Sequence, residues 1–143
     1  MTAWTSTRNS APKIGDTASR THLITQEDTE AWARISEDRN PLHFDEQAAA
    51  ASVFGHTVAH GGVLSGIISG LIAQDLPGPG TVFLGVEWRF EKPVRIGEQV
   101  TGEVEVLEVR ADKPICRLAT RVLRADGIPA LTGTIRTYTS ALD

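Results

Sequence analysis

Apolar and polar residues alternate through the second half of the chain, and this alternation predicts β-strands. It is clearest at Val100, Val104 and Val106, which are separated by polar residues or glycine at every second position. A period of two is that of a strand with one buried face. Short turn-forming sequences with glycine or aspartate separate successive runs. We therefore expect four antiparallel strands, within residues 81–94, 98–110, 114–126 and 128–139.

The first half carries helix signals. Thr25 followed by Asp28 is typical of a helix start, because the threonine hydroxyl accepts a backbone N–H and the acid favours the positive end of the helix. This helix should end near residues 36–37, because Pro41 disfavours helical geometry in the residue before it. A strand near 20–24 precedes the helix. A short alanine-rich helix over 45–51 follows it.

Residues 62–76 are apolar on most faces, which predicts a buried helix that is too short to span a membrane. Gly62, Gly66 and Gly70 recur at every fourth position. Glycine in a helix costs about 1 kcal/mol relative to alanine, so the repeat indicates a packing demand. We expect this glycine ridge to let the sheet pack closely around the helix.

Together these patterns predict a single α+β domain in which an antiparallel sheet wraps around a long central helix. A chain of 143 residues suits one such core. Residues 1–12 are polar, and we expect a flexible tail there, ahead of a domain over 13–143. Trp4 then belongs to the tail, whereas Trp32 and Trp88 anchor the core.

Composition excludes several kinds of partner. Eighteen acidic residues against fourteen basic ones leave a net charge of −4, without a basic cluster, so nucleic acid is not an expected partner. The single cysteine, Cys116, lies in a strand-like run and cannot form an internal disulfide. The first residues hold no apolar leader segment. We expect a cytoplasmic protein that does not bind membranes.

The stretch SEDRNPLH, from Ser36 to His43, is the strongest candidate for chemistry. If the turn at Asn40 folds the loop, Asp38 and His43 come within reach of one water molecule. A carboxylate and an imidazole on the same water can share its deprotonation and return a proton to a neighbouring carbon, which adds water to a double bond. The alternative is an Asx-turn followed by a surface histidine, and spacing alone does not separate the two.

Addition of water also needs an electrophile held in place. Backbone N–H groups around Gly61 and Gly62, at the start of the long helix, can donate to a thioester oxygen and stabilise the developing negative charge. We expect no metal, because His56 and His60 have i, i+4 spacing but glycines follow directly and no helix is indicated across the pair. GxSxG, GxGxxG and CxxC sequences are absent.

With these residues in view, the sequence resembles the MaoC-like (R)-specific enoyl-CoA hydratases, a branch of the hot-dog superfamily. Their signature is similar to S-G-D-x-N-P-[LIV]-H-x-D, and residues 36–45 read SEDRNPLHFD. The resemblance runs from about Lys13 to Tyr138 and includes AHGG before the long helix. It implies a hot-dog domain over 13–143 and favours the catalytic interpretation of the loop.

The resemblance also implies site residues: the catalytic pair Asp38 and His43, the loop-ordering Asn40, and an oxyanion donor at Gly61 or Gly62. Two positions depart from the family pattern. Glu37 replaces the usual glycine beside the catalytic acid. Gly66 stands where some members carry a serine, and the adjacent Ser65 can substitute for it.

The implied activity is reversible hydration of a trans-2-enoyl-CoA to the (R)-3-hydroxyacyl-CoA, without a cofactor beyond the CoA or phosphopantetheine that carries the substrate. Three alternatives stay open: a dehydratase acting on carrier-protein-bound 3-hydroxyacyl intermediates, a hot-dog acyl-thioesterase, and a non-catalytic acyl-thioester-binding module. The Asp38 and His43 loop weighs against the thioesterase. We further expect a homodimer that covers the exposed edge of the sheet.

Overall fold

The structure is a computed structural model that describes residues 2–143; Met1, the first residue of the expected tail, lies outside the described residues. The elements follow in the order β1 (Thr17–Leu23), α1 (Gln26–Ser36), α2 (Pro41–Phe44), α3 (Glu46–Ala50), α4 (Gly61–Gln74), β2 (Thr81–Phe90), β3 (Gln99–Val109), β4 (Ile115–Leu123) and β5 (Pro129–Thr139).

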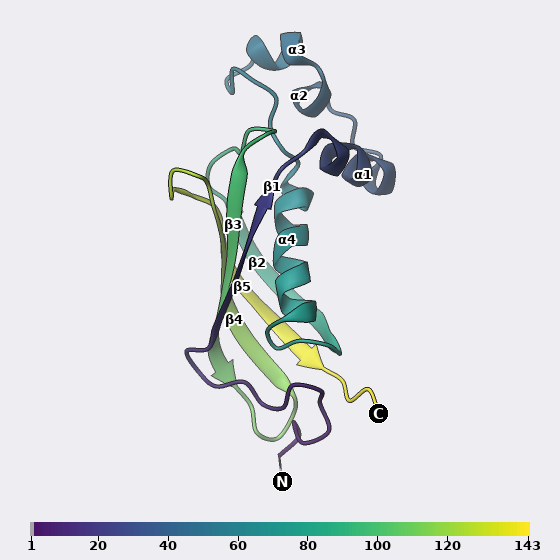
Figure 1. The fold of residues 1–143 in the computed structure, drawn as a ribbon, viewed down its shortest axis with the longest axis vertical. Helices are drawn as coiled ribbons and strands as arrows, with labels where there is room; N and C mark the ends of the chain where they lie inside the picture. Colours follow the sequence, from purple (N-terminus) through teal and green to yellow (C-terminus); the bar gives the residue numbers. More distant parts are fainter. Residues whose placement is uncertain (1) are drawn as a thin grey trace.

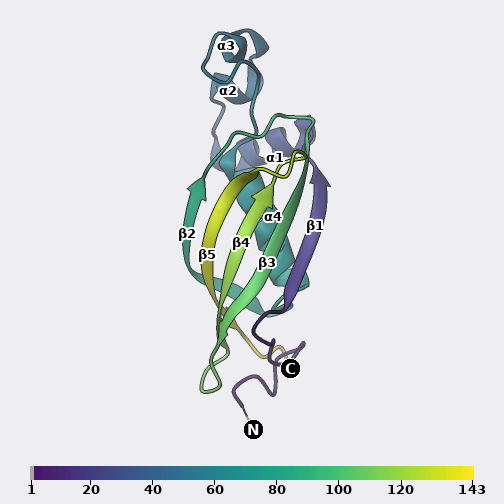
Figure 2. The ribbon, with the colours of Figure 1, turned by 90° about the vertical axis from the view of Figure 1, so that its left-hand side faces the viewer.

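The strands form one antiparallel sheet in the order β1-β3-β4-β5-β2, so β1 and β2 are its edges. Figure 1 shows α4 lying along one face of this sheet, and Figure 2 shows the strands from the opposite face. The expected α+β architecture and the four strands after residue 80 are confirmed. The first strand begins three residues earlier than predicted, because its pairing with β3 extends to Thr17 opposite Glu105.

The core lies between α4 and the sheet. Leu64, Ile68, Leu71 and Ile72 are buried on one side of the helix and belong to one hydrophobic cluster with residues of β3, β4 and β5. Each such side chain contributes about 1.5–3 kcal/mol when it leaves water. Close approach of helix and sheet depends on Gly102 of β3, where an added Cβ would lie 2.8 Å from the Ile67 side chain.

The prediction that the glycine ridge of α4 lets the sheet pack closely around the helix is wrong for Gly62 and Gly66. A Cβ at Gly62 would overlap the Trp32 ring of α1, and one at Gly70 would meet the Arg20 side chain of edge strand β1. Gly66 has no heavy atom within 4 Å of the place where its Cβ would lie. The ridge therefore faces α1 at Gly62 and edge strand β1 at Gly70, while another side of α4 carries the large aliphatic residues that the sheet buries.

The prediction that Trp4 lies in the tail is also wrong. Its side chain is 1% exposed and belongs to the hydrophobic cluster, and its indole N–H donates to the Arg110 carbonyl at 2.6 Å. A large apolar ring with one polar N–H is well placed where the ring is buried and the N–H finds a carbonyl. Trp88 packs against the cluster as expected, but Trp32 is only half-buried and lies outside it.

Residues 2–12 hold no helix or strand. Their flexibility stays a prediction. Cys116 is buried in the core as expected, and burial raises the pKa of its thiol to about 11, which keeps it from acting as a nucleophile near neutral pH. Within residues 2–143, every helix is too short or too polar to cross a membrane.

Candidate active site

The loop after α1 is folded by its own polar side chains. Glu37 ends α1 in a left-handed conformation with φ 63° and ψ 13°, and its N–H donates to the Ala33 carbonyl. The Asp38 N–H then donates to the Ser36 hydroxyl at 3.1 Å. The Asn40 N–H donates to Asp38 Oδ1, also at 3.1 Å, which closes an Asx-turn. The predicted turn therefore exists and fixes one oxygen of the Asp38 carboxylate.

Residues 41–44 form a single helical turn, α2, where a continuous loop was expected. Asn40 caps it, because its side-chain oxygen accepts the Leu42 N–H at 3.1 Å, and Pro41 occupies the first helical position. The signal was present in the sequence as Asn-Pro. The turn brings His43 back toward Asp38, so Asn40 orders the loop in the way that the family resemblance implies.

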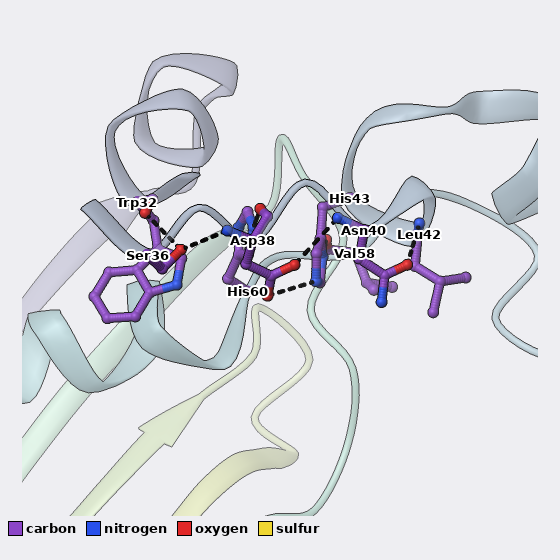
Figure 3. Close-up of polar contacts among 8 residues, drawn as sticks. All are labelled: Trp32, Ser36, Asp38, Asn40, Leu42, His43, Val58 and His60. Atoms are coloured by element: carbon purple, nitrogen blue, oxygen red, sulfur yellow. Dashed lines mark hydrogen bonds and ion pairs between the residues drawn. The ribbon is translucent and has the colours of Figure 1, made fainter. Parts of the chain in front are cut away.

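His43 presents one ring nitrogen to Asp38. Its Nδ1 donates to the Val58 carbonyl at 2.6 Å, and since a carbonyl only accepts, Nδ1 carries the hydrogen. In the neutral ring Nε2 therefore holds a free lone pair. Nε2 lies 3.9 Å from Asp38 Oδ2 (Figure 3), which is too long for a direct hydrogen bond but suits a shared water molecule. The structure thus brings the predicted pair together.

The two side chains differ in their exposure to solvent. The His43 side chain is 13% exposed and that of Asp38 is 44% exposed, so the pair has a buried partner and an open one. The segment that holds His43 is itself anchored. Val58 N–H donates to the Leu42 carbonyl, and Ala59 N–H donates to the Val94 carbonyl at 2.8 Å. His43 is therefore held, through residues 58 and 59, against the segment that follows β2.

His60 is a site residue that the sequence analysis missed. It is 1% exposed, its Nε2 donates to the Asp38 carbonyl at 2.9 Å, and its ring stacks on that of His43 with centroids 3.9 Å apart (Figure 3). Its only sequence signal was its place directly before the glycines that begin α4. It belongs to the AHGG stretch of the family resemblance, but the only role weighed for its side chain was that of a metal ligand with His56.

Gly61 and Gly62 form the first two positions of α4, immediately after His60. N–H groups in a first helical turn lack partners within the helix, so they remain available to a ligand. Added Cβ atoms would lie 2.7 Å from Phe90 at Gly61 and 2.0 Å from Trp32 at Gly62. Close packing therefore requires glycine at both positions. The oxyanion role of either glycine stays a prediction.

Ser65 lies one turn into α4, and its hydroxyl donates back to the Gly62 carbonyl at 2.9 Å. The hydrogen is thus used within the helix, while the oxygen keeps a free lone pair. Contact between Ser65 and substrate stays a prediction.

A pocket of about 460 Å³ lies beside the first turn of α4. Gly61 and Leu64 line it from the helix, and Phe54, Phe90 and Val94 line it from the neighbouring segments. Its walls are mostly apolar, and Glu91 and Lys92 add one charge of each sign to the lining.

Asp38, His43 and His60 each place a potential metal-ligating atom within 4.8 Å of the others. The two imidazole rings are nearly parallel, however, with an interplanar angle of 28°. A metal ion binds an imidazole nitrogen along its lone pair, which lies in the plane of the ring, and two stacked rings do not share such a position. The stacked arrangement of the two rings therefore does not suit a metal centre.

Comparison with known proteins identifies relatives across most of the chain. Residues 9–125 match the family model described as a MaoC like domain. The chain is 41% identical to the (R)-specific enoyl-CoA hydratase of Aeromonas caviae over 121 residues, which is 85% of this chain and 90% of that protein. It is 42% identical to the 3-hydroxybutyryl-CoA dehydratase of Methylorubrum extorquens over 96 residues, 67% of this chain and 61% of that protein.

Solved structures agree with these sequence matches. The fold superimposes with a TM-score of 0.87 on the (R)-hydratase from A. caviae involved in PHA biosynthesis, at 39% identity, and the match covers 90% of this chain and 98% of that one.

Proposed function

The chain belongs to the MaoC-like domain family, and from that premise we propose that it is an (R)-specific enoyl-CoA hydratase of the hot-dog fold. It adds water reversibly to a trans-2-enoyl-CoA and forms the (R)-3-hydroxyacyl-CoA. The observation that carries the proposal is the 3.9 Å separation of Asp38 Oδ2 and His43 Nε2, with the hydrogen of His43 held on the other ring nitrogen.

In the proposed reaction Asp38 and His43 hold one water molecule between them. Its oxygen forms a bond to C3 of the enoyl group, while the pair takes one of its protons and returns a proton to C2. Charge moves onto the thioester oxygen as the double bond is broken. The N–H of Gly61 or Gly62, at the positive end of α4, stabilises that charge. The reverse sequence removes water from the 3-hydroxyacyl thioester.

The apolar pocket beside Gly61 supports a place for the acyl chain next to the proposed oxyanion donor. A thioester whose carbonyl oxygen meets the start of α4 can extend its chain along Leu64 and Phe90. CoA is the proposed carrier, because the relatives in A. caviae and M. extorquens are named for CoA thioesters. Dehydration of a carrier-protein-bound intermediate would use the same chemistry with another carrier.

We also propose a cytoplasmic homodimer. Support for the dimer comes from edge strand β2, where Val82, Leu84 and Val86 are each about half exposed. An exposed apolar edge strand is a surface that pairs with another chain. Support for the cytoplasm comes from the single cysteine, which is buried in the core and is not part of a disulfide.

Crotonyl-CoA hydration tests the proposed activity. Loss of the enoyl ultraviolet absorbance, with a product of (R) configuration, is the expected result. Release of free thiol would indicate a thioesterase instead. If absorbance and free thiol both stay constant while calorimetry detects binding of crotonyl-CoA, the protein is a binding module. Activity only on the carrier-protein thioester would identify the dehydratase alternative.

A further inference from the structure

We propose that His60 is a positioning residue that holds both members of the Asp38 and His43 pair in their working geometry. The inference rests on the proposed function, because it assigns His60 a part in that reaction. The Nε2 of His60 is bonded to the Asp38 backbone and its Nδ1 is buried, so it acts through the other two residues.

Two different contacts carry the proposal. The Nε2 hydrogen of His60 bonds the Asp38 backbone carbonyl, and Asp38 lies in an exposed loop that has few other ties to the core. The imidazole ring of His60 stacks on the His43 ring, with centroids 3.9 Å apart. One side chain thus fixes the backbone of Asp38 and the ring plane of His43. His60 also directly precedes Gly61, so it adjoins Asp38, His43 and the proposed oxyanion donor at the start of α4.

His60 is enclosed from several sides. Phe44 meets its ring edge-on with centroids 5.9 Å apart, and the side chain is 1% exposed. The hydrogen on Nε2 leaves Nδ1 as an acceptor in the neutral ring, and Nδ1 has no hydrogen-bond partner among residues 2–143. A buried polar atom without a partner costs stability. An apolar ring of similar shape would avoid that cost but would give up the hydrogen bond to the Asp38 carbonyl, so the benefit that singles out histidine here is its hold on the Asp38 backbone.

Two substitutions separate the contacts. His60→Phe keeps a ring that can stack on His43 but removes the donor to Asp38. His60→Gln keeps an N–H donor at a similar reach but removes the ring. Misplacement of reacting groups by about 1 Å can cost on the order of 100-fold in rate. We therefore expect each variant to lower kcat on crotonyl-CoA by roughly 10- to 100-fold, with KM close to that of the wild type.

Thermal melting distinguishes positioning from a structural role. His60→Phe should melt close to the wild-type temperature while its kcat falls, because losing the hydrogen bond to the Asp38 carbonyl and losing the unpaired Nδ1 have opposite effects on stability. In the Asp38→Ala background His60→Phe should lower kcat little further, because residues that act as a unit are non-additive. His56→Ala is the matched control: in the part of the chain that the structure describes, its ring bonds only the neighbouring Thr57 carbonyl, at 3.1 Å, and activity should be unchanged.

Nitrogen NMR of the histidine rings provides a readout that does not depend on activity. In the wild type we expect the hydrogen on Nε2 of His60 and on Nδ1 of His43, and a changed His43 ring signal in His60→Phe. The proposal is overturned if folded His60→Phe and His60→Gln both keep wild-type kcat, or if His60 carries its hydrogen on Nδ1. If neither variant folds, His60 has a structural role, and the proposal is overturned as well. An inactive wild type with the expected ring signals would reject the proposed activity, but it would leave the geometry of the contact established.

Discussion

Asp38 and His43 act on one water molecule in the proposed reaction, so either residue alone lacks its partner. We expect Asp38→Ala, His43→Ala and the double variant to lower turnover by a similar factor, about 10²–10⁴-fold. The melting temperature of Asp38→Ala should change little, because the Asp38 side chain is almost half exposed and its turn hydrogen bond contributes only about 1 kcal/mol. His43→Ala and the double variant should melt lower, because they remove a largely buried ring that donates to the Val58 carbonyl and stacks on His60. Turnover and melting are measured on the same three proteins. Near-normal turnover in a folded single variant would mean that the loop is a structural turn and that the pair is not catalytic.

Glu37 stands where the family signature has glycine, and its φ of 63° lies in the region that glycine adopts without cost. A left-handed non-glycine residue costs about 1–2 kcal/mol, and the extra freedom of glycine in the unfolded chain offsets part of this. We expect Glu37→Gly to raise the free energy of unfolding by up to about 1 kcal/mol, as measured by urea denaturation.

Glu37→Ala is the control for that prediction, since it removes the carboxylate but keeps the Cβ. If Glu37→Ala stabilises the protein as much as Glu37→Gly does, the effect comes from removing the charge and not from the backbone conformation. Hydratase activity should survive both changes, because the loop already has the conformation that glycine favours.

Much of the site was predictable at the residue scale, but not His60. Asp38, Asn40 and His43 sit in one short signature whose turn chemistry is local. His60 reaches Asp38 across 22 positions of sequence, and only the fold brings the two together. Trp4 was missed for the same reason: its partner is the Arg110 carbonyl, 106 positions away.

Among the elements, α1 depends on a capping box at its first turn. The Thr25 hydroxyl accepts the Asp28 N–H while the Asp28 carboxylate accepts the Thr25 N–H at 2.9 Å, and His22 Nε2 of β1 contacts the same carboxylate at 2.8 Å. Partial burial tends to raise the pKa of the Asp28 carboxyl, but the hydrogen bonds from Thr25 and the contact with His22 outweigh it, and the pKa lies below its ordinary value.

A lowered carboxyl pKa adds stability above the unfolded pKa, and that stability is lost as pH falls through the folded pKa. Asp28→Asn should therefore lower the free energy of unfolding at pH 7, by about 1 kcal/mol for a cap of this kind. The difference in free energy of unfolding between Asp28→Asn and the wild type should shrink as pH falls below about 4, where Asp28 of the unfolded wild type is protonated. Thermal melts of both proteins across this pH range provide the test. A difference that is constant with pH would mean that the charge plays no part.

Element boundaries were predictable where a signal was local. Thr25 and Asp28 indicated α1, and alternating valines indicated β3. The orientation of α4 was not predictable in the same way, because its sequence is apolar on most faces. Which side meets the sheet is decided by Gly102 on the facing strand and by the position of Trp32, and neither is adjacent to α4 in sequence.

For the whole molecule, the exposed apolar edge at β2 predicts self-association. We expect sedimentation to give a dimer for the wild type. Val86→Lys should shift it toward monomer, because a charge on an edge strand opposes pairing. Ile14→Lys replaces another exposed apolar residue, outside the strands, and should leave the dimer intact. A monomeric wild type at assay concentration would contradict the proposed assembly.

The anchoring of the proposed site has a consequence for how the protein loses activity on heating. No side chain between residues 37 and 57 belongs to the buried cluster that α4 forms with the sheet. A few hydrogen bonds and the His60 ring tie the loop that carries Asp38 and His43 to the rest of the fold, so we expect it to open sub-globally while the sheet remains intact. Its amide hydrogens, such as those of Asn40 and Leu42, should exchange with deuterium well before those in the middle of β3 and β4. Catalysis would then fade at temperatures where circular dichroism still reports a fully formed sheet.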